Sequence, residues 1–190
     1  MLNRRLAAAL VPAVAAATLG FGLLAGPGTA GAASPKPAAA KAKGESIEGK
    51  PAPAIELDRA DGKKFSLAAE KGNVVVLDFW ATWCPPCRKS LPHIEAISAD
   101  AKLAEKGLRV YAVNLREDKG KIDPFLKDNK YSFAVPMDVA GKAAAAYGVA
   151  GIPTTVIVGR DGKVKNVFVG FGEGSEKRLD DAIAAALAEK

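Results

Sequence analysis

The sequence predicts one domain of the α/β class, about 140 residues long. A continuous apolar run over residues 74–80 is typical of a strand covered on both faces of a sheet. Helical and strand patterns alternate after it, as they do when helices connect the strands of one sheet. Two further strand patterns, joined by a tight turn, and a last helical pattern complete the chain. We find no internal repeat.

The spacing of apolar residues gives the order of the elements. A hairpin is expected around Asp61-Gly62, and a second one around the turn Arg160-Asp161-Gly162. Pro124 in a first turn allows regular helix to begin at Asp123, and Ser175 is the expected cap of the last helix. Strands are expected over residues 55–58, 64–67, 74–80, 108–115, 133–135, 154–158 and 164–169. Helices are expected over residues 85–105, 119–130 and 141–147, and from residue 175 onward.

Residues 1–33 have the order of a secretory signal: a basic head, an uncharged apolar stretch and then small residues. The alternative is that residues 6–25 stay as a membrane anchor, because about twenty apolar residues can span a bilayer. Residues 34–50 consist mostly of Pro, Ala, Lys and Gly, which predicts a disordered linker. Residues 51–190 form the expected domain. The functional part is therefore expected to be periplasmic or otherwise extracytoplasmic, either secreted or membrane-anchored.

The charge of the chain excludes some partners. The full sequence carries a formal net charge of +6, and removal of residues 1–33 takes away two arginines and no acids. Several of the remaining extra lysines lie in the linker. No basic cluster is interleaved with aromatic residues, so nucleic-acid binding is not expected. Contact with a membrane is expected only if residues 6–25 are retained.

The only two cysteines of the chain, Cys84 and Cys87, lie in a C-x-x-C motif between the strand at 74–80 and a helical pattern. This placement predicts a redox-active pair. The alternative is an inert, purely structural disulfide, but two cysteines three positions apart cannot connect distant segments. A structural zinc site needs about four ligands, and the chain offers two cysteines and one histidine. We expect no metal and no cofactor.

The position of the pair predicts a mechanism. Cys84 at the start of a helix faces free backbone N–H groups and the positive end of the helix dipole, and both favour the thiolate. Cys87 lies one turn later and is expected to be more buried. Cys84 would attack a substrate disulfide, and Cys87 would resolve the mixed disulfide. In reverse, the same steps oxidise a dithiol.

Three segments resemble the thioredoxin superfamily, and more narrowly its extracytoplasmic TlpA/ResA-type thiol–disulfide oxidoreductases: residues 75–87 (VVLDFWATWCPPC), 148–155 (GVAGIPTT) and 162–170. The resemblance covers essentially residues 51–190. It implies a three-layer fold with a central mixed sheet flanked by helices, an N-terminal β-hairpin and a central αβ insertion. The 39 positions between Asn114 and Pro153 leave room for that insertion.

The resemblance also implies roles for single residues. Pro153 matches the family's cis-proline, which would present the backbone of Ile152 to an incoming chain. Asp78 matches a buried carboxylate that relays protons to the second cysteine, and burial raises the pKa of such a group. Residues beside the cysteines would support the site and bind substrate: Trp83, Pro85 and Pro86.

Two positions depart from the TlpA/ResA pattern. Ser90 stands where this branch often has an acidic residue, and Asp78 stands where many members have an uncharged one. Cytochrome c maturation, which is tied to that acidic residue, is therefore less firmly implied than general redox homeostasis. His93, the only histidine, is expected to lie about 9 Å along the helix from Cys87 and to point away from the sulfurs.

The resemblance favours a reductase of protein disulfides that is recharged by a transmembrane thiol donor. One alternative is an oxidase of the same fold, which the reduction potential would distinguish. Another is a copper-binding thiol chaperone, which metal titration of the reduced protein would distinguish. A peroxidase is disfavoured because both cysteines belong to one C-x-x-C motif.

Overall fold

The computed structural model describes residues 46–189. The expected signal or anchor, residues 1–33, and most of the expected linker, residues 34–50, lie outside the described residues. Within residues 46–189, no helix has both the length and the apolar character needed to cross a bilayer.

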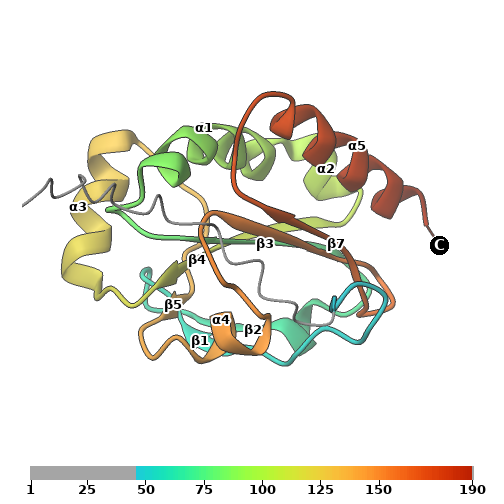
Figure 1. The fold of residues 1–190 in the computed structure, drawn as a ribbon, viewed down its shortest axis with the longest axis horizontal. Coiled ribbons are helices and arrows are strands. Elements are labelled where there is room, and N and C mark those ends of the chain that lie inside the picture. The colour runs from blue at the N-terminus through green and yellow to red at the C-terminus, as the bar shows by residue number, and fades with distance from the viewer. Residues whose placement is uncertain (1–45, 190) are drawn as a thin grey trace, which may run out of the picture. The chain divides into compact units, whose positions relative to one another are not determined.

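A five-stranded mixed sheet forms the centre of the domain (Figure 1). Its strands, in spatial order, are β5 (Met137–Asp138), β4 (Leu108–Leu115), β3 (Val74–Trp80), β6 (Thr154–Val158) and β7 (Val164–Val169). β3, β4 and β5 are parallel, whereas β6 and β7 run antiparallel to their neighbours. The predicted α/β class is confirmed. The four long strands also have the predicted bounds.

Helices cover one face of the sheet, and the N-terminal hairpin covers the other (Figure 1). Side chains alternate along β3, so that Val76 and Trp80 face the helical layer while Leu77 and Phe79 face the hairpin. The helical layer consists of α1 (Pro85–Ala99), α2 (Ala101–Glu105), α3 (Lys119–Asn129) and α5 (Ser175–Ala188). The opposite layer consists of β1 (Glu56–Asp58), β2 (Lys64–Ser66), the 3-10 turn η1 (Leu67–Glu70) and α4 (Lys142–Ala146).

The chain between β4 and β6 holds α3, β5 and α4. The additional strand and helix that the resemblance implied are therefore present. Together with the antiparallel β1–β2 hairpin, they give the expected three-layer thioredoxin-like fold.

Two sequence predictions are wrong where a polar residue or a proline interrupts a pattern. The helix expected over 85–105 ends at Ala99, because the Asp100 carboxylate accepts hydrogen bonds from the amides of Lys102 and Leu103 and so starts α2. The strand expected over 133–135 is reduced to a single bridge between Ala134 and Tyr111. Pro136 follows it, and a proline cannot donate to a sheet ladder.

α3 begins at Lys119, as the expected range 119–130 predicted, and not at the alternative start Asp123, because the Asp118 side chain accepts from the amide of Lys121 and caps the helix there. The start of α5 differs from the prediction. α5 begins with Ser175 as its first helical residue, after Gly174 at positive φ. The Ser175 hydroxyl accepts from the amide of Gly172, so it closes the preceding turn instead of capping the helix.

Packing begins before the expected domain start at residue 51. The amide of Gly49 donates to the carbonyl of Val164 at 2.7 Å, and the amide of Val164 donates to the carbonyl of Lys50 at 3.0 Å. The Glu48 carboxylate accepts from the amide of Val167 at 2.8 Å. Ile47 packs against the apolar cluster on the hairpin side of the sheet. The last residues of the expected linker therefore belong to the folded domain.

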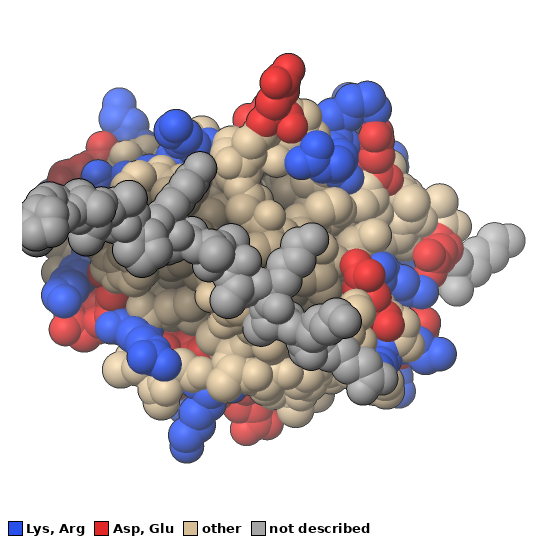
Figure 2. Space-filling model, in the orientation of Figure 1, with Lys and Arg blue, Asp and Glu red and all other residues tan. Residues whose placement is uncertain are grey.

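Basic and acidic side chains are intermingled around the visible rim of the domain (Figure 2). Neither sign forms a continuous patch on the part of this face that is in view.

Candidate active site

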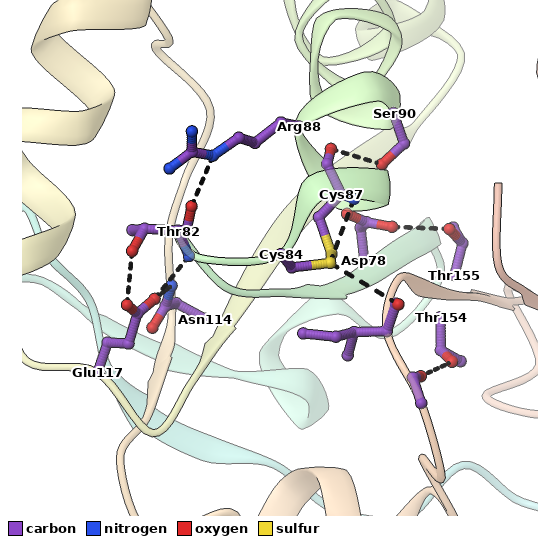
Figure 3. Close-up of a disulfide and its surroundings, with 12 residues drawn as sticks. Asp78, Thr82, Cys84, Cys87, Arg88, Ser90, Asn114, Glu117, Thr154 and Thr155 are labelled. Atoms are coloured by element: carbon purple, nitrogen blue, oxygen red, sulfur yellow. Dashed lines mark hydrogen bonds between the residues drawn. A yellow bond between two sulfur atoms is a disulfide. The ribbon is translucent and has the colours of Figure 1, made fainter. Parts of the chain in front are cut away.

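Cys84 and Cys87 form a disulfide where β3 leads into α1 (Figure 3). Their sulfurs are 2.06 Å apart and their Cα atoms 5.3 Å apart. Cys84 is the N-cap of α1, and the amide of Cys87 donates to its sulfur at 3.2 Å. Pro85 and Pro86 occupy the first helical positions, where a missing N–H costs no helical hydrogen bond. The structure therefore places the Cys84 sulfur at the positive end of a helix, as the sequence predicted.

The two cysteines differ little in exposure. Cys84 is 2% exposed and Cys87 is 0% exposed. The surface around them comes from their neighbours, because Pro85 and Pro86 are exposed and Trp83 is 65% exposed. An incoming chain would therefore meet the Trp83 ring and the two prolines before it reached the sulfurs.

The loop before β6 lies against the first cysteine. The predicted cis bond between Ile152 and Pro153 is confirmed. The carbonyl oxygen of Ile152 lies 3.7 Å from the Cys84 sulfur. The amide of Gly170, just after β7, donates to the carbonyl of Pro153 at 2.7 Å and fixes the loop from its other side.

Asp78 is fully buried in the middle of β3. It lies on the same face as Val76 and Trp80, which is the face packed against α1 and Cys87. The Thr155 hydroxyl donates to its Oδ1 at 2.7 Å, whereas its Oδ2 has no hydrogen-bond partner among the described residues. Burial raises the pKa of Asp78 to about 7, and the Thr155 hydrogen bond opposes part of that rise. A carboxyl group that titrates near neutrality can exchange protons in either direction.

The two positions singled out beside the motif have structural partners. Ser90 is buried, and its hydroxyl donates to the carbonyl of Cys87 at 2.9 Å. The Nε2 atom of His93 lies 2.9 Å from Oδ1 of Asp180, so this side chain joins α1 to α5. Within residues 46–189, no group of three or more His, Cys, Asp or Glu side chains is arranged to hold a metal ion.

Glu117 is a residue of the site that the sequence reasoning missed. It is 3% exposed and follows β4, beside the loop that leads to Cys84 (Figure 3). Its carboxylate accepts from the amide of Thr82 at 2.7 Å, from the Thr82 hydroxyl at 2.6 Å and from Nδ2 of Asn114 at 2.9 Å. The guanidinium of Arg88 donates to the carbonyl of Thr82 at 2.7 Å. The peptide groups on both sides of Thr82 are therefore fixed by hydrogen bonds to side chains.

Replacement of Glu117 by alanine should destabilise the domain and slow the reaction of Cys84. One buried donor and two partly buried ones would lose their acceptor, which should lower the free energy of unfolding by about 2–4 kcal/mol. The loss of the Thr82 contacts should also loosen the loop that positions Cys84. Urea denaturation and the rate of thiol alkylation of the reduced protein measure the two effects.

The matched control is Glu95→Ala. Glu95 also accepts three hydrogen bonds, from the amide and hydroxyl of Ser132 and from the amide of Phe133, but it is only half-buried and lies in α1 away from this loop. We expect a smaller loss of stability and no change in the alkylation rate. An equal change in alkylation rate for both variants would contradict a specific role for Glu117.

Comparison with known proteins agrees with the geometry of the cysteine pair. The model of the Redoxin family matches residues 47–183. The thiol-disulfide oxidoreductase ResA of Bacillus subtilis (strain 168) is 37% identical over 127 residues, which is 66% of this chain and 70% of the relative.

Two solved structures share the fold. A Chlorobium tepidum protein assigned as the thiol:disulfide interchange protein DsbE is 38% identical, with a TM-score of 0.70, and the match covers 75% of this chain and 99% of that one. A secreted Mycobacterium tuberculosis disulfide oxidoreductase, described as homologous to DsbE of E. coli, is 25% identical with a TM-score of 0.57. That match covers 69% of this chain and 95% of the solved chain.

Proposed function

This chain belongs to the Redoxin family and is a thiol–disulfide oxidoreductase of the TlpA/ResA type, and from that premise we propose that it reduces protein disulfides outside the cytoplasm. The observation that carries the proposal is the Cys84–Cys87 disulfide at the start of α1, with the Ile152 carbonyl facing its first sulfur. A pair placed in this way can alternate between disulfide and dithiol without any cofactor.

The catalytic cycle assigns a separate role to each cysteine. The Cys84 thiolate attacks a substrate disulfide, whose S–S bond breaks, and one substrate sulfur leaves as a thiolate. Cys87 then loses its proton to Asp78, and its thiolate attacks the Cys84 sulfur. The second substrate thiolate leaves, and the Cys84–Cys87 disulfide of this structure is the product. Two electrons have passed from the cysteine pair to the substrate.

Exposed groups around the disulfide would bind the substrate chain. Trp83 is 65% exposed and Val169, at the end of β7, is 72% exposed. Val169 pairs with Thr154, directly after Pro153, and Trp83 directly precedes Cys84, whose sulfur lies 3.7 Å from the Ile152 carbonyl, so both residues adjoin the Ile152–Pro153 loop. We propose that an extended substrate segment lies along this loop, with its cysteine at Cys84 and its apolar side chains on Trp83 and Val169.

The extracytoplasmic setting is part of the proposal. Residues 1–33 have the order of a signal or anchor, residues 34–50 are rich in Pro, Ala and Lys, and one relative of known structure is described as secreted. In such a compartment a reductase must be recharged from the membrane, so we propose a transmembrane thiol donor. Mass spectrometry of the exported protein would detect an N-terminus near residue 34 if residues 1–33 are removed.

The reduction potential tests the direction of electron flow. We expect the Cys84–Cys87 couple to lie below about −230 mV, nearer to the −270 mV of thioredoxin than to the −120 mV of DsbA. The positive end of α1 favours a thiolate at Cys84, whereas the Ile152 carbonyl near its sulfur and the buried Asp78 carboxylate oppose it, and we expect the opposing effects to prevail. A less stable thiolate makes the dithiol a stronger reductant.

Equilibration with glutathione buffers, read by thiol alkylation, gives this potential. The variant with serine at both Cys84 and Cys87 has no thiol left and gives the background of the alkylation measurement. A potential near −120 mV would contradict the proposed reductase and indicate an oxidase. If the reduced protein bound copper tightly and turned over no protein disulfides, both the reductase and the oxidase would be contradicted, and a metal-binding chaperone would be indicated.

A further inference from the structure

A cavity of about 240 Å³ lies between α1, β7 and α5, on the α1 side of the sheet. Its lining includes Ser90 from α1, one turn beyond Cys87, and Thr155 from β6. His93 and Arg178, which bear the ionisable groups of its wall, line it together with apolar residues of β7. A space of this size with polar side chains on its wall can hold several water molecules. None of the steps described above uses it.

Thr155 touches both this cavity and Asp78. Within β3 and its neighbours, Asp78 stands opposite Ala112 on β4 and opposite Thr155 on β6. Ala112 has no polar side-chain atom, so Thr155 is the only described side chain that hydrogen-bonds to the Asp78 carboxyl group. In Figure 3 the Thr155 hydroxyl points directly at Asp78.

We propose that the Thr155 hydroxyl passes protons between Asp78 and water in the cavity lined by Ser90 and Thr155. A hydroxyl group can donate one hydrogen bond and accept others at the same time. When Asp78 has taken the proton of Cys87, its Oδ1–H gives that proton to the Thr155 oxygen, and the Thr155 hydroxyl gives its own proton to a cavity water. In the opposite direction, water protonates Thr155 while Thr155 protonates Asp78.

This proposal rests on the role of Asp78 in the proposed function, and Thr155 acts in it as a positioning residue. Burial gives such a route a purpose, because Asp78 is fully buried and without a path to water its carboxyl group could pass the proton of Cys87 only back to Cys87. The ionisable groups on the cavity are His93, which pairs with Asp180, and Arg178, which hydrogen-bonds to Ser175. Cys87 on α1 is the titratable group on the Asp78 side.

The test measures how fast Asp78 exchanges its proton, by carbon-13 NMR of the aspartate carboxyl carbons across pH 5–9 in the full-length disulfide form. Asp78→Asn identifies the resonance. In the wild type, we expect one line that moves continuously with pH. In Thr155→Val we expect proton exchange to slow by about a hundredfold, so that the line broadens or splits. The midpoint should also rise, because the hydrogen bond that lowers the pKa of Asp78 is gone.

Two variants separate a proton route from a structural role. Thr155→Ser keeps the hydroxyl and should restore the continuous line. Thr154→Val removes the neighbouring buried hydroxyl, which donates to the carbonyl of Gly151 and not to Asp78, and should leave the line as in the wild type. A shifted midpoint with unchanged exchange in Thr155→Val would overturn the proposal, because Thr155 would then only tune the pKa.

The proposed function can fail independently of this route. If Asp78→Asn leaves the resolution of mixed disulfides at the wild-type rate, the role of Asp78 fails and the route has no purpose. If Asp78→Asn slows resolution while Thr155→Val leaves proton exchange unchanged, only the route fails, and the protons of Asp78 leave through the face of the disulfide.

Discussion

Reduced Cys87→Ser protein, mixed with insulin, will accumulate as a covalent complex joined through Cys84. Cys84 lies at the positive end of α1 and can attack, but without Cys87 nothing inside the protein can release the substrate. Cys84→Ser will form no such complex, because Cys87 lies one turn into α1, whereas Cys84 is the N-cap and its sulfur faces the Ile152 carbonyl. Both variants should lose insulin-reducing activity by more than about a thousandfold, as expected when one member of a catalytic pair is removed.

Non-reducing gel electrophoresis and intact-mass measurement detect the complex, and dithiothreitol should dissolve it. The variant with serine at both positions is the control for association without a covalent bond. Thermal melting shows whether each variant is folded. If Cys84→Ser formed the complex and Cys87→Ser did not, Cys87 would be the attacking cysteine and Cys84 the resolving one.

Asp78→Asn will stabilise the disulfide form of the protein at pH 8 and have little effect near pH 4. The pKa of Asp78 is raised from 3.8 to about 7 in the folded state, mainly by burial. Between these two values the folded state binds a proton that the unfolded state has released, so stability falls as the pH rises. The full contribution is present below about pH 4 and is lost once the pH passes about 7. A shift of this size corresponds to roughly 4 kcal/mol.

Urea denaturation at pH 4, 6 and 8 measures the effect. The amide can still accept the hydrogen bond from Thr155, so the comparison isolates the charge. Measurements near pH 4 serve as the internal control, because Asp78 is largely protonated there in the folded state. The same variant should slow the resolution step at pH 8. If the stability of the wild type and the variant kept a constant difference across this range, Asp78 would not titrate near neutrality.

The fold could be predicted where apolar runs are continuous. β3, β4 and β6 have the predicted bounds, because burial on both faces gives a mostly apolar run with sharp ends. β7 is mostly half-buried, and its place follows from the Arg160-Asp161-Gly162 turn before it. The errors fall at positions where one side chain decides between two local structures. Asp100 ends a helix whose pattern continues past it, and Pro136 shortens a strand that looked regular. The sequence pattern alone does not show which of two such local structures is the more stable.

The residues of the site also fall into those that the sequence predicted and those that it did not. Cys84, Cys87 and Pro153 were found because their motifs are local in sequence or match a family pattern. Glu117 and Thr155 were missed because their roles depend on contacts with residues 35 and 77 positions away in the chain. A glutamate shortly after a buried strand was the only available signal for Glu117. Its hydrogen bonds to Thr82 required the register of β3 and β4.

The pairing of residues 48–50 with β7 closes an edge of the sheet to which another extended chain could otherwise add. An open sheet edge presents free N–H and C=O groups to which any extended polypeptide can add as a new strand. Gly49 and Lys50 occupy these groups at Val164, and the Glu48 carboxylate occupies the amide of Val167. At the opposite edge, β5 has two residues, and Ala60 donates to the carbonyl of Val135 beside it. Guarded edges direct the extended substrate segment proposed above to the Ile152–Pro153 loop, and they would keep the domain from adding such a segment to its sheet.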